Sequence, residues 1–393
     1  MFKEYAHSII GKIEEKLEWA ELATFVPNKK TPVYNWFYYK EGFSRELVLK
    51  ILDMFQHDVS LPVLDPFCGS GTTLLACREL GIDSVGLDVL PVSIFASSVK
   101  AKDYDTATVR EIYSGFRRKF EKLPSEYPPL MKRAFSKFAL EDIAFLMRDI
   151  MKIEDEKYRD FFILALINAS IRCSYARKDG GSLKIRKRQA APLRIMFRNV
   201  VKKMAKDVKR LSFRDCRTGV ALCDARRLEL EDESVGSIIT SPPYLNNIDY
   251  TKVYAIEEFF IRPKGLPPMR SYIGSRISED GFLGLPQAAV SYFKDMEKVL
   301  GELYRVCVPG ANVALVVGNG YLPGSRRLPG DLGERTFSTD VSGVVDSDVV
   351  LAYMAEQLGF SLEKIIVLNK RFALENRSEK VGTLRESLLW LRK

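Results

Sequence analysis

Histidine is scarce in this 393-residue sequence, which has only His7 and His57, and its six cysteines include no Cys-x-x-Cys pair. Structural zinc sites use closely spaced Cys and His ligands, so we expect no metal site. Without such sites or obvious disulfide spacing, most of the cysteines are expected to be buried thiols of a protein from a reducing compartment.

Long apolar segments are also lacking. No window approaches the roughly 18 uninterrupted apolar residues expected of a membrane-spanning helix. Charged residues are spread through residues 1–22, so a signal peptide is not expected either. The composition, 46% hydrophobic and 28% charged, is that of ordinary globular proteins. We therefore predict a cytoplasmic protein without membrane contact, long enough for two or three domains.

Positive charge is in excess, and the excess is local. The chain carries a net charge of +9, while residues 177–217 hold fifteen Lys or Arg against three Asp, so the rest of the chain is slightly acidic. Such a segment is typical of a polyanion-binding surface, because neutralised phosphates release counterions. A solvated helix face is the alternative. The Gly-Gly pair at 180–181, between basic residues, and the helical spacing of apolar residues over 193–211 favour the first interpretation.

Short apolar runs separated by helical patterns predict an α/β fold. Residues 61–67 and 84–88 are expected to be strands on either side of a helix that ends at Gly81, a unit typical of parallel, doubly wound sheets. A helical pattern then covers about residues 104–216. Strand patterns resume afterwards, at residues 220–224, 235–241, 312–319, 362–369 and 386–393, with a helix over 294–307.

The simplest organisation is one α/β domain, formed by residues 1–105 and 218–393 and interrupted by a helical, basic insertion at 106–217. Residues 320–348 are rich in Gly, Pro and Arg and are expected to form a long surface loop.

A glycine-rich turn, DPFCGSGTT at residues 65–73, lies between a predicted strand and a predicted helix. It is not a phosphate loop, because no Lys follows the glycines, and Leu74 occupies the third glycine position of a dinucleotide motif. Asp88 ends the next strand, where a carboxylate can accept both ribose hydroxyls of a nucleoside. A nucleoside ligand without pyrophosphate therefore fits best, although a glycine turn by itself is more often only structural.

A second turn, Ser241-Pro242-Pro243-Tyr244, closes the predicted strand 235–241 at the edge where open α/β sheets bind ligands. Its two prolines fix the backbone and have no N–H donors, which leaves carbonyl acceptors beside an aromatic ring. A rigid turn that only packs Tyr244 is the alternative for this motif alone. Together with the glycine-rich turn and Asp88, it indicates a functional site.

These residues resemble the motifs of amino-methyltransferases that act on DNA with S-adenosylmethionine. DPFCGSGTT resembles the family's cofactor loop, and TSPPY its catalytic motif, in the SPPY form typical of cytosine-N4 enzymes. The resemblance extends to residues 32–52, 86–91, 223–244 and 302–320. It implies a class I methyltransferase fold, a Rossmann-like, doubly wound and mostly parallel sheet of seven strands, here with a helical insertion domain.

The resemblance also implies which residues bind the cofactor, S-adenosylmethionine. Asp65, Gly69 and Gly71 would shape the methionine side, Asp88 would bind the ribose, and Asp224 would bind the adenine amino group. The other candidate cofactor-binding residues are Phe43, Ser44, Phe67 and Thr72.

The implied catalytic residues are Ser241, Pro242, Pro243 and Tyr244. Ser241 Oγ and the Pro242 carbonyl would accept the two amino N–H bonds of a base flipped out of the duplex, and Tyr244 would stack on that base. No metal is required. Cytosine-C5 enzymes use a Cys directly after a Pro, and no cysteine here follows a proline. Asn246, Asn247 and Asp249 are expected either to shape the base pocket or to form the turn.

The expected function is site-specific methylation of cytosine N4 in double-stranded DNA, within a restriction-modification or related system that can include a cognate endonuclease. The basic insertion would hold much of the target recognition, because the chain ends on a strand with no room for a recognition domain. One alternative is an adenine-N6 DNA or RNA amino-methyltransferase, since Ser241 alone does not decide the acceptor. A non-catalytic nucleic-acid-binding module is the other, but it predicts damaged motifs, and these are intact.

Overall fold

Eight strands form a central sheet in the order β1-β11-β12-β8-β7-β2-β3-β6. The computed structural model describes residues 2–116, 119–179, 181–245, 248–265, 273–274, 287–321, 344–375 and 379–393. The strands are β1 (Ile13–Glu15), β2 (Val63–Asp65), β3 (Ser84–Asp88), β6 (Thr218–Leu222), β7 (Val235–Thr240), β8 (Cys307–Gly318), β11 (Ser361–Glu375) and β12 (Glu379–Arg392).

Neighbouring strands of the sheet pair in parallel, except that β12 is antiparallel to both β8 and β11. This confirms the doubly wound, mostly parallel fold and all seven predicted strands. The eighth strand, β1, was not predicted. It has only three residues, two of them glutamates, so it lacks an apolar run and is formed by pairing with the edge of β11.

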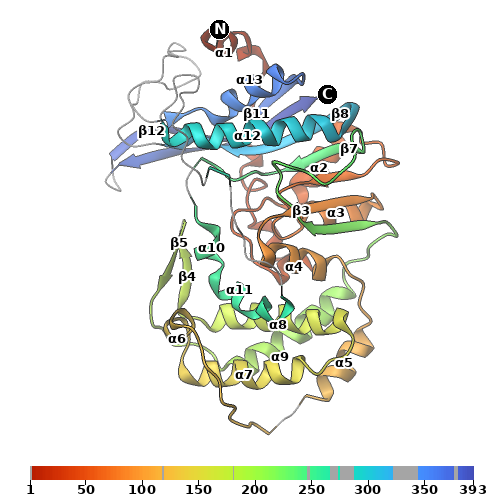
Figure 1. The fold of residues 1–393 in the computed structure, drawn as a ribbon, viewed down its shortest axis with the longest axis vertical. Helices are drawn as coiled ribbons and strands as arrows, with labels where there is room; N and C mark the ends of the chain where they lie inside the picture. The colour runs from red at the N-terminus through yellow and green to blue at the C-terminus, as the bar shows by residue number, and fades with distance from the viewer. Residues whose placement is uncertain are drawn as a thin grey trace.

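Helices cover both faces of the sheet (Figure 1). One face packs against α2 (Arg45–Phe55) and α3 (Thr72–Leu80), and the other against α12 (Gln287–Val306), α13 (Ser347–Gln357) and α1 (Phe2–Ser8). The alternation along β8 explains how one strand serves both layers. Val313, Leu315 and Val317 belong to the second core, whereas Ala314 and Val316 belong to the first.

A helical region lies at one end of the sheet, beyond α4 (Pro91–Lys100) (Figure 1). It contains α5 (Thr106–Ser114), α6 (Pro129–Ala134), α7 (Lys137–Ile150), α8 (Glu156–Cys173) and α9 (Leu193–Val208). The helical pattern predicted for residues 104–216 is therefore confirmed. The pattern did not predict the antiparallel hairpin between α8 and α9, formed by β4 (Ala176–Asp179) and β5 (Ser182–Ile185).

The helical region shares its hydrophobic core with the rest of the chain. One cluster joins α8 and α9 to α4, to Trp36 and to α11 (Ala255–Ile261), which follows the SPPY turn and the short helix α10 (Tyr250–Val253). Removing residues 106–217 would therefore expose apolar side chains that lie on both sides of the insertion. Surface substitutions are the better way to test what the insertion binds.

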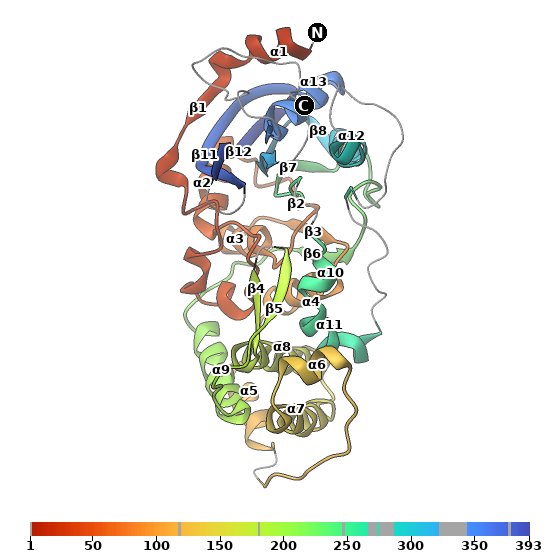
Figure 2. The ribbon, with the colours of Figure 1, turned by 90° about the vertical axis from the view of Figure 1, so that its left-hand side faces the viewer.

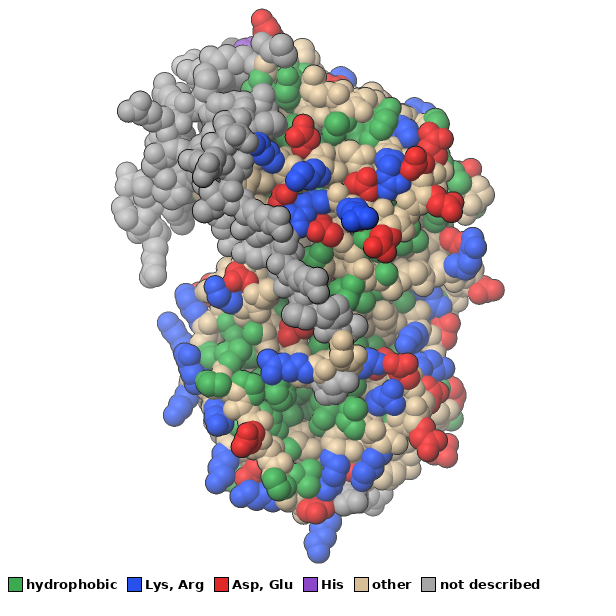
Figure 3. Space-filling view, viewed as in Figure 1, with side chains coloured by type: hydrophobic (Ala, Val, Ile, Leu, Met, Phe, Trp, Pro, Cys, Tyr) green, Lys and Arg blue, Asp and Glu red, His purple; other side chains and the backbone are tan. Residues whose placement is uncertain are grey.

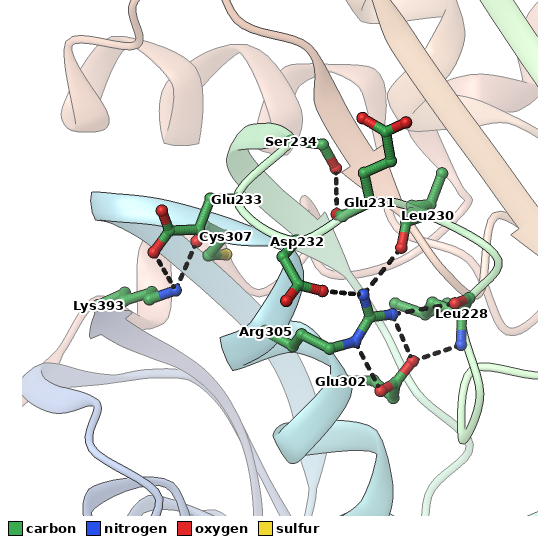
Figure 4. Close-up of polar contacts among 10 residues, drawn as sticks. All are labelled: Leu228, Leu230, Glu231, Asp232, Glu233, Ser234, Glu302, Arg305, Cys307 and Lys393. Carbon is green, nitrogen blue, oxygen red and sulfur yellow. Dashed lines mark hydrogen bonds and ion pairs between the residues drawn. The ribbon is translucent and has the colours of Figure 1, made fainter.

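Arg305 and its hydrogen-bond partners fix the segment that leads into β7. The Arg305 guanidinium, at the end of α12, donates to the carbonyls of Leu228 and Leu230 and pairs with Asp232 and Glu302 (Figure 4). The Arg305–Asp232 distance is 2.6 Å. β7 begins at Val235 and ends just before the SPPY turn. The contacts of Arg305 therefore hold the strand that carries the SPPY turn against α12.

Two predictions fall wholly or partly outside the described residues. Asn246 and Asn247 are outside them, as are residues 322–343 of the expected surface loop. The ends of that loop form a two-stranded pair, β9 (Gly320–Tyr321) with β10 (Val344–Val345). In the described ranges no helix combines the length and apolarity needed to cross a bilayer, and no cluster of His, Cys, Asp or Glu there is arranged to hold a metal ion.

Candidate active site

A cavity of about 570 Å³ lies at the carboxyl ends of β2, β3, β6, β7 and β8. This volume is within the range of small-molecule and cofactor pockets. Eleven of the thirteen candidate site residues line the cavity: Phe43, Asp65, Phe67, Gly69, Thr72, Asp88, Asp224, Ser241, Pro242, Pro243 and Tyr244. The structure thus brings the glycine-rich turn and the SPPY turn, which are far apart in sequence, to one site.

The two remaining candidates, Ser44 and Gly71, do not line the cavity and have local structural roles. Ser44 is the N-cap of α2, where its Oγ accepts from the Leu47 N–H at 3.2 Å. Gly71 precedes α3 with φ of 75°, and a Cβ there would lie 2.9 Å from Ser97 Oγ. Gly69, which does line the cavity, has φ of 50°, and its Cβ would lie 2.7 Å from the Tyr39 ring.

Asp65 connects the two turns. Its carboxylate accepts from Thr240 Oγ1 at 2.6 Å, from Thr73 Oγ1 at 2.7 Å and from the Phe67 N–H at 3.2 Å. Thr240 immediately precedes the SPPY turn, whereas Phe67 and Thr73 belong to the glycine-rich turn. Burial raises the pKa of Asp65 to about 6, although the three hydrogen bonds act in the opposite direction.

Asp88 holds the glycine-rich turn from the neighbouring strand. One carboxylate oxygen accepts from the Gly69 N–H at 2.9 Å and the other from the Leu90 N–H at 2.8 Å. Burial raises the pKa of Asp88 to about 6, against the effect of these backbone donors. Each oxygen has a second lone-pair direction, so the carboxylate can still accept from a ligand in the cavity.

Asp224 lines the cavity beside β6 and forms a bidentate pair with Arg226. The Nη2–Oδ2 distance is 2.6 Å and the Nε–Oδ1 distance is 3.0 Å. Arg226 also contacts Asp295 of α12 at 2.9 Å. The carboxylate is therefore held in a fixed orientation at the cavity wall.

Tyr244 has a fixed position at the end of the SPPY turn. Its hydroxyl donates to Glu386 Oε1 at 2.6 Å, and its ring packs on Gly318 of β8, where a Cβ would lie 2.6 Å from Tyr244 Cδ2. Burial, and then the neighbouring Glu386 carboxylate, raise the pKa of Tyr244 well above its ordinary value. Asp249, a few residues later, is the N-cap of α10 and does not line the cavity, so it forms the turn.

One side of the cavity was not predicted from the sequence. The antiparallel strands β11 and β12 contribute Asn369, Arg371, Arg385 and Glu386 to its wall. In the sequence, Arg385 and Glu386 stand shortly before the apolar residues of β12. These two polar residues were a signal that this part of the strand faces something other than the core. Which of them reach the cavity depends on the pairing of β12 with β8, where Glu386 lies opposite Gly318.

Comparisons with known proteins identify the family of this chain. A family profile described as DNA methylase matches residues 12–93 and 235–393, which leaves out the basic insertion. The chain is 23% identical to the type II methyltransferase M.BsoBI of Geobacillus stearothermophilus, covering 92% of this chain and 85% of that protein. It is 25% identical to M.AvaI of Anabaena variabilis, covering 92% and 86%.

Among solved structures, a methyltransferase from Methanosarcina mazei is similar at 10% identity and a TM-score of 0.31, covering 87% of this chain and 96% of that one. The family profile covers more than half of the sequence, and its two matched ranges hold the glycine-rich and SPPY turns that meet at the cavity. The chain therefore belongs to the DNA methylase family, as an amino-methyltransferase whose cofactor is S-adenosylmethionine.

Proposed function

We propose that this enzyme methylates the exocyclic N4 amine of cytosine at a specific site in double-stranded DNA. The observation that carries the proposal is the SPPY turn, with serine at position 241, on the wall of the cavity that also contains the glycine-rich turn. The relatives named type II methyltransferases support a role in a restriction-modification system, where a cognate endonuclease would act on the same site without a stable complex. The six cysteines are all free, which supports a cytoplasmic location.

The cavity has the groups that the cofactor requires. The Asp88 carboxylate can accept from ribose hydroxyls, and Asp224 can accept from the adenine amino group. Phe43 and Phe67 provide apolar walls, and Gly69 lets the backbone approach the ligand closely. When bound, S-adenosylmethionine supplies a methyl group on a positively charged sulfur.

The SPPY turn is proposed to act on the target base. Ser241 Oγ and the Pro242 carbonyl accept from the two amino N–H bonds, which draws the nitrogen lone pair out of the ring system and makes it nucleophilic. Flipping the base costs a few kcal/mol. Stacking on Tyr244 offsets roughly 1–3 kcal/mol of this. Holding the amine in line with the methyl group supplies much of the acceleration.

The acceptor base is tested by transferring labelled methyl groups to duplex DNA and digesting the product to nucleosides. We expect the label in N4-methyl-2′-deoxycytidine. Label in N6-methyl-2′-deoxyadenosine would instead support the second candidate function, because the same turn can hold an adenine amine. Label found only in RNA would contradict a DNA substrate.

Cofactor affinity is expected to fall as the pH is lowered through about 6. Burial raises the pKa of Asp88 to about 6, and only the ionised form offers its full acceptor capacity to the ribose. Calorimetric titration with S-adenosylmethionine between pH 5 and pH 8 measures this dependence. The Asp88→Asn variant should bind weakly at every pH. Wild-type affinity that does not change over this range would contradict the role of Asp88.

The hairpin β4–β5 is the proposed point of contact with DNA beside the cavity. Gly181, at its turn, lines the cavity, and a Cβ there would lie 3.1 Å from Ile248 Cγ1, just beyond the SPPY turn. Figure 2 shows the hairpin reaching from the helical region toward α10. The exposed basic side chains on the hairpin and directly after it are Arg177, Lys184, Arg186, Lys187 and Arg188. Lys and Arg side chains gather on that edge of the molecule (Figure 3).

Replacing Arg186 and Lys187 together by glutamate is expected to weaken DNA binding at least tenfold while cofactor affinity stays unchanged. If both contact phosphates, the slope of log affinity against log salt should decrease by about 1.8, at about 0.9 per phosphate. Fluorescence anisotropy with duplex DNA at several salt concentrations measures both effects. The control is the double replacement of Lys50 and Lys298 by glutamate. These lysines are exposed on α2 and α12, away from the hairpin. Equal losses in the two double variants would contradict a contact at the hairpin.

A further inference from the structure

The cavity contains the Glu386 carboxylate, to which the methyl transfer described above assigns no role. Glu386 reaches the cavity from β12, on the side opposite the glycine-rich turn, and is half-buried. Its Oε1 accepts the Tyr244 hydroxyl at 2.6 Å, a short bond of the kind formed to an ionised acceptor. The two residues are 142 positions apart, so only the folded sheet brings them together.

Ser241 and Tyr244 interact on the same turn, because the Ser241 side chain hydrogen-bonds that of Tyr244 and thereby opposes the rise in the tyrosine's pKa. The single proton of the Tyr244 hydroxyl is donated to Glu386, so in this bond Tyr244 Oη accepts and the Ser241 hydroxyl is the donor. Ser241 Oγ is also the proposed acceptor for the target amine. The donors then point in one direction, from the amine to Ser241, from Ser241 to Tyr244, and from Tyr244 to Glu386.

The groups around Glu386 come from three strands and the SPPY turn. Burial raises its pKa above the ordinary value, while hydrogen bonds from Tyr244 and Asn369 and the charge of Arg371 act in the opposite direction. Gly318 of β8 adds no charge. Arg385, the neighbour on β12, pairs with Asp348 at 2.7 Å and 2.9 Å. Glu386 is thus a half-buried carboxylate whose basicity is above normal.

We propose that Glu386 receives the proton that leaves the target amine, by way of Ser241 and Tyr244. The inference rests on the proposed amino methylation. The nitrogen lone pair forms the new N–C bond, and the S–C bond breaks with its electron pair remaining on sulfur. The nitrogen then carries one proton too many. That proton passes to Ser241 Oγ, the serine proton passes to Tyr244 Oη, and the tyrosine proton passes to the Glu386 carboxylate, which leaves a neutral methylamine.

Glu386→Gln is the first test, because glutamine keeps the size and the acceptor oxygen but cannot take up a proton at these pH values. Single-turnover methyl transfer at saturating DNA and cofactor should be at least 100-fold slower, within the range for general acid–base catalysis. Dissociation constants for both ligands should stay within about twofold. Tyr244→Phe should be slowed similarly, and the double variant should be no slower than either single variant, because both interrupt one path. Glu363→Gln, on the exposed face of β11, is the matched control and should transfer methyl groups at the wild-type rate.

The pH profile separates proton transfer from a purely structural role. The wild-type rate should fall as the pH is lowered through the raised pKa of Glu386, because a protonated carboxyl cannot accept, and this dependence should vanish in Glu386→Gln. Because the cofactor is saturating, protonation of Asp65 or Asp88 that weakens cofactor binding does not contribute to the pH dependence of the rate. In the free protein, carbon NMR of labelled glutamate should show one carboxyl titrating above the normal range. That resonance should be absent in Glu386→Gln and shifted to higher pKa in Tyr244→Phe, which loses a stabilising donor.

A Glu386→Gln enzyme with the wild-type rate would overturn the inference, and so would a slow Glu386→Gln enzyme that keeps the wild-type pH dependence. Either result leaves the proposed function intact, provided that the wild-type protein methylates DNA. Failure of the wild-type protein to label the cytosine amine, with the DNA and cofactor both bound, would instead reject the proposed function.

Discussion

Replacing Asp65 by alanine is expected to reduce the affinity for S-adenosylmethionine by at least 100-fold and to abolish measurable methyl transfer. The variant loses all three hydrogen bonds that join Phe67 and Thr73 of the glycine-rich turn to Thr240 before the SPPY turn. Hydrogen bonds to a charged group contribute about 1.5–3 kcal/mol each. Without these bonds, cofactor binding must itself bring the two turns together, and a cost equal to two such bonds exceeds the roughly 2.7 kcal/mol that corresponds to a 100-fold change in affinity. Calorimetric titration at pH 8, where Asp65 is ionised, measures the affinity.

Asp65→Asn is the matched control for this prediction. Its amide can donate to the Thr73 hydroxyl, which can redirect its own proton to the Ile239 carbonyl, 3.4 Å away. The remaining oxygen can still accept from Thr240. We therefore expect a loss of affinity of about tenfold, from one weakened bond. If alanine and asparagine have the same effect, the hydrogen-bond geometry of Asp65 is not what joins the two turns.

Replacing Asp348 by alanine is expected to lower the free energy of unfolding by about 3–5 kcal/mol, because it leaves the Arg385 guanidinium buried without its main partner. The side chain of Asp348 is fully buried, that of Arg385 is 8% exposed, and the Nε–Oδ2 distance is 2.7 Å. Asp348 also accepts from Ser387 Oγ at 2.8 Å. Urea unfolding followed by circular dichroism measures the loss.

The ion pair between Arg217 and Asp83 is the comparison for burial. Its N–O distance is 2.6 Å, close to that of the buried pair, but the Arg217 side chain is 93% exposed. Solvent screening limits such a pair to about 1 kcal/mol or less, so Arg217→Ala should have a small effect. Similar losses in Asp348→Ala and Arg217→Ala would show that burial does not decide the cost.

The parallel strands and their motifs could be predicted because their signals are local. Short apolar runs followed by glycine or proline turns gave β2 and β7, and parallel strands direct their carboxyl ends to one edge. The meeting of DPFCGSGTT and SPPY therefore follows from local pattern plus the fold class. In contrast, β1 and the hairpin β4–β5 have little or no apolar run, and pairing with other segments decides that they are strands.

Candidate residues inside the two turns were identified by type, but their contacts were not. Ser44 and Gly71 belong to recognisable segments, and the structure shows a local role for each, since a helix cap or a positive φ is satisfied within a few residues. The role of Asp65 in joining both turns depends on Thr240, which is 175 residues away.

The sequence by itself determined the class of fold, the glycine-rich turn, the SPPY turn and the segment that carries the excess positive charge, since each is a pattern among near neighbours. Only the tertiary structure decided that the basic hairpin reaches the cavity, that the insertion shares its core with the α/β domain, and that Glu386 meets Tyr244. The physical reason is that strand register and side-chain packing join residues more than 100 positions apart. A shift of β12 by one residue would turn Glu386 to the other face of the sheet.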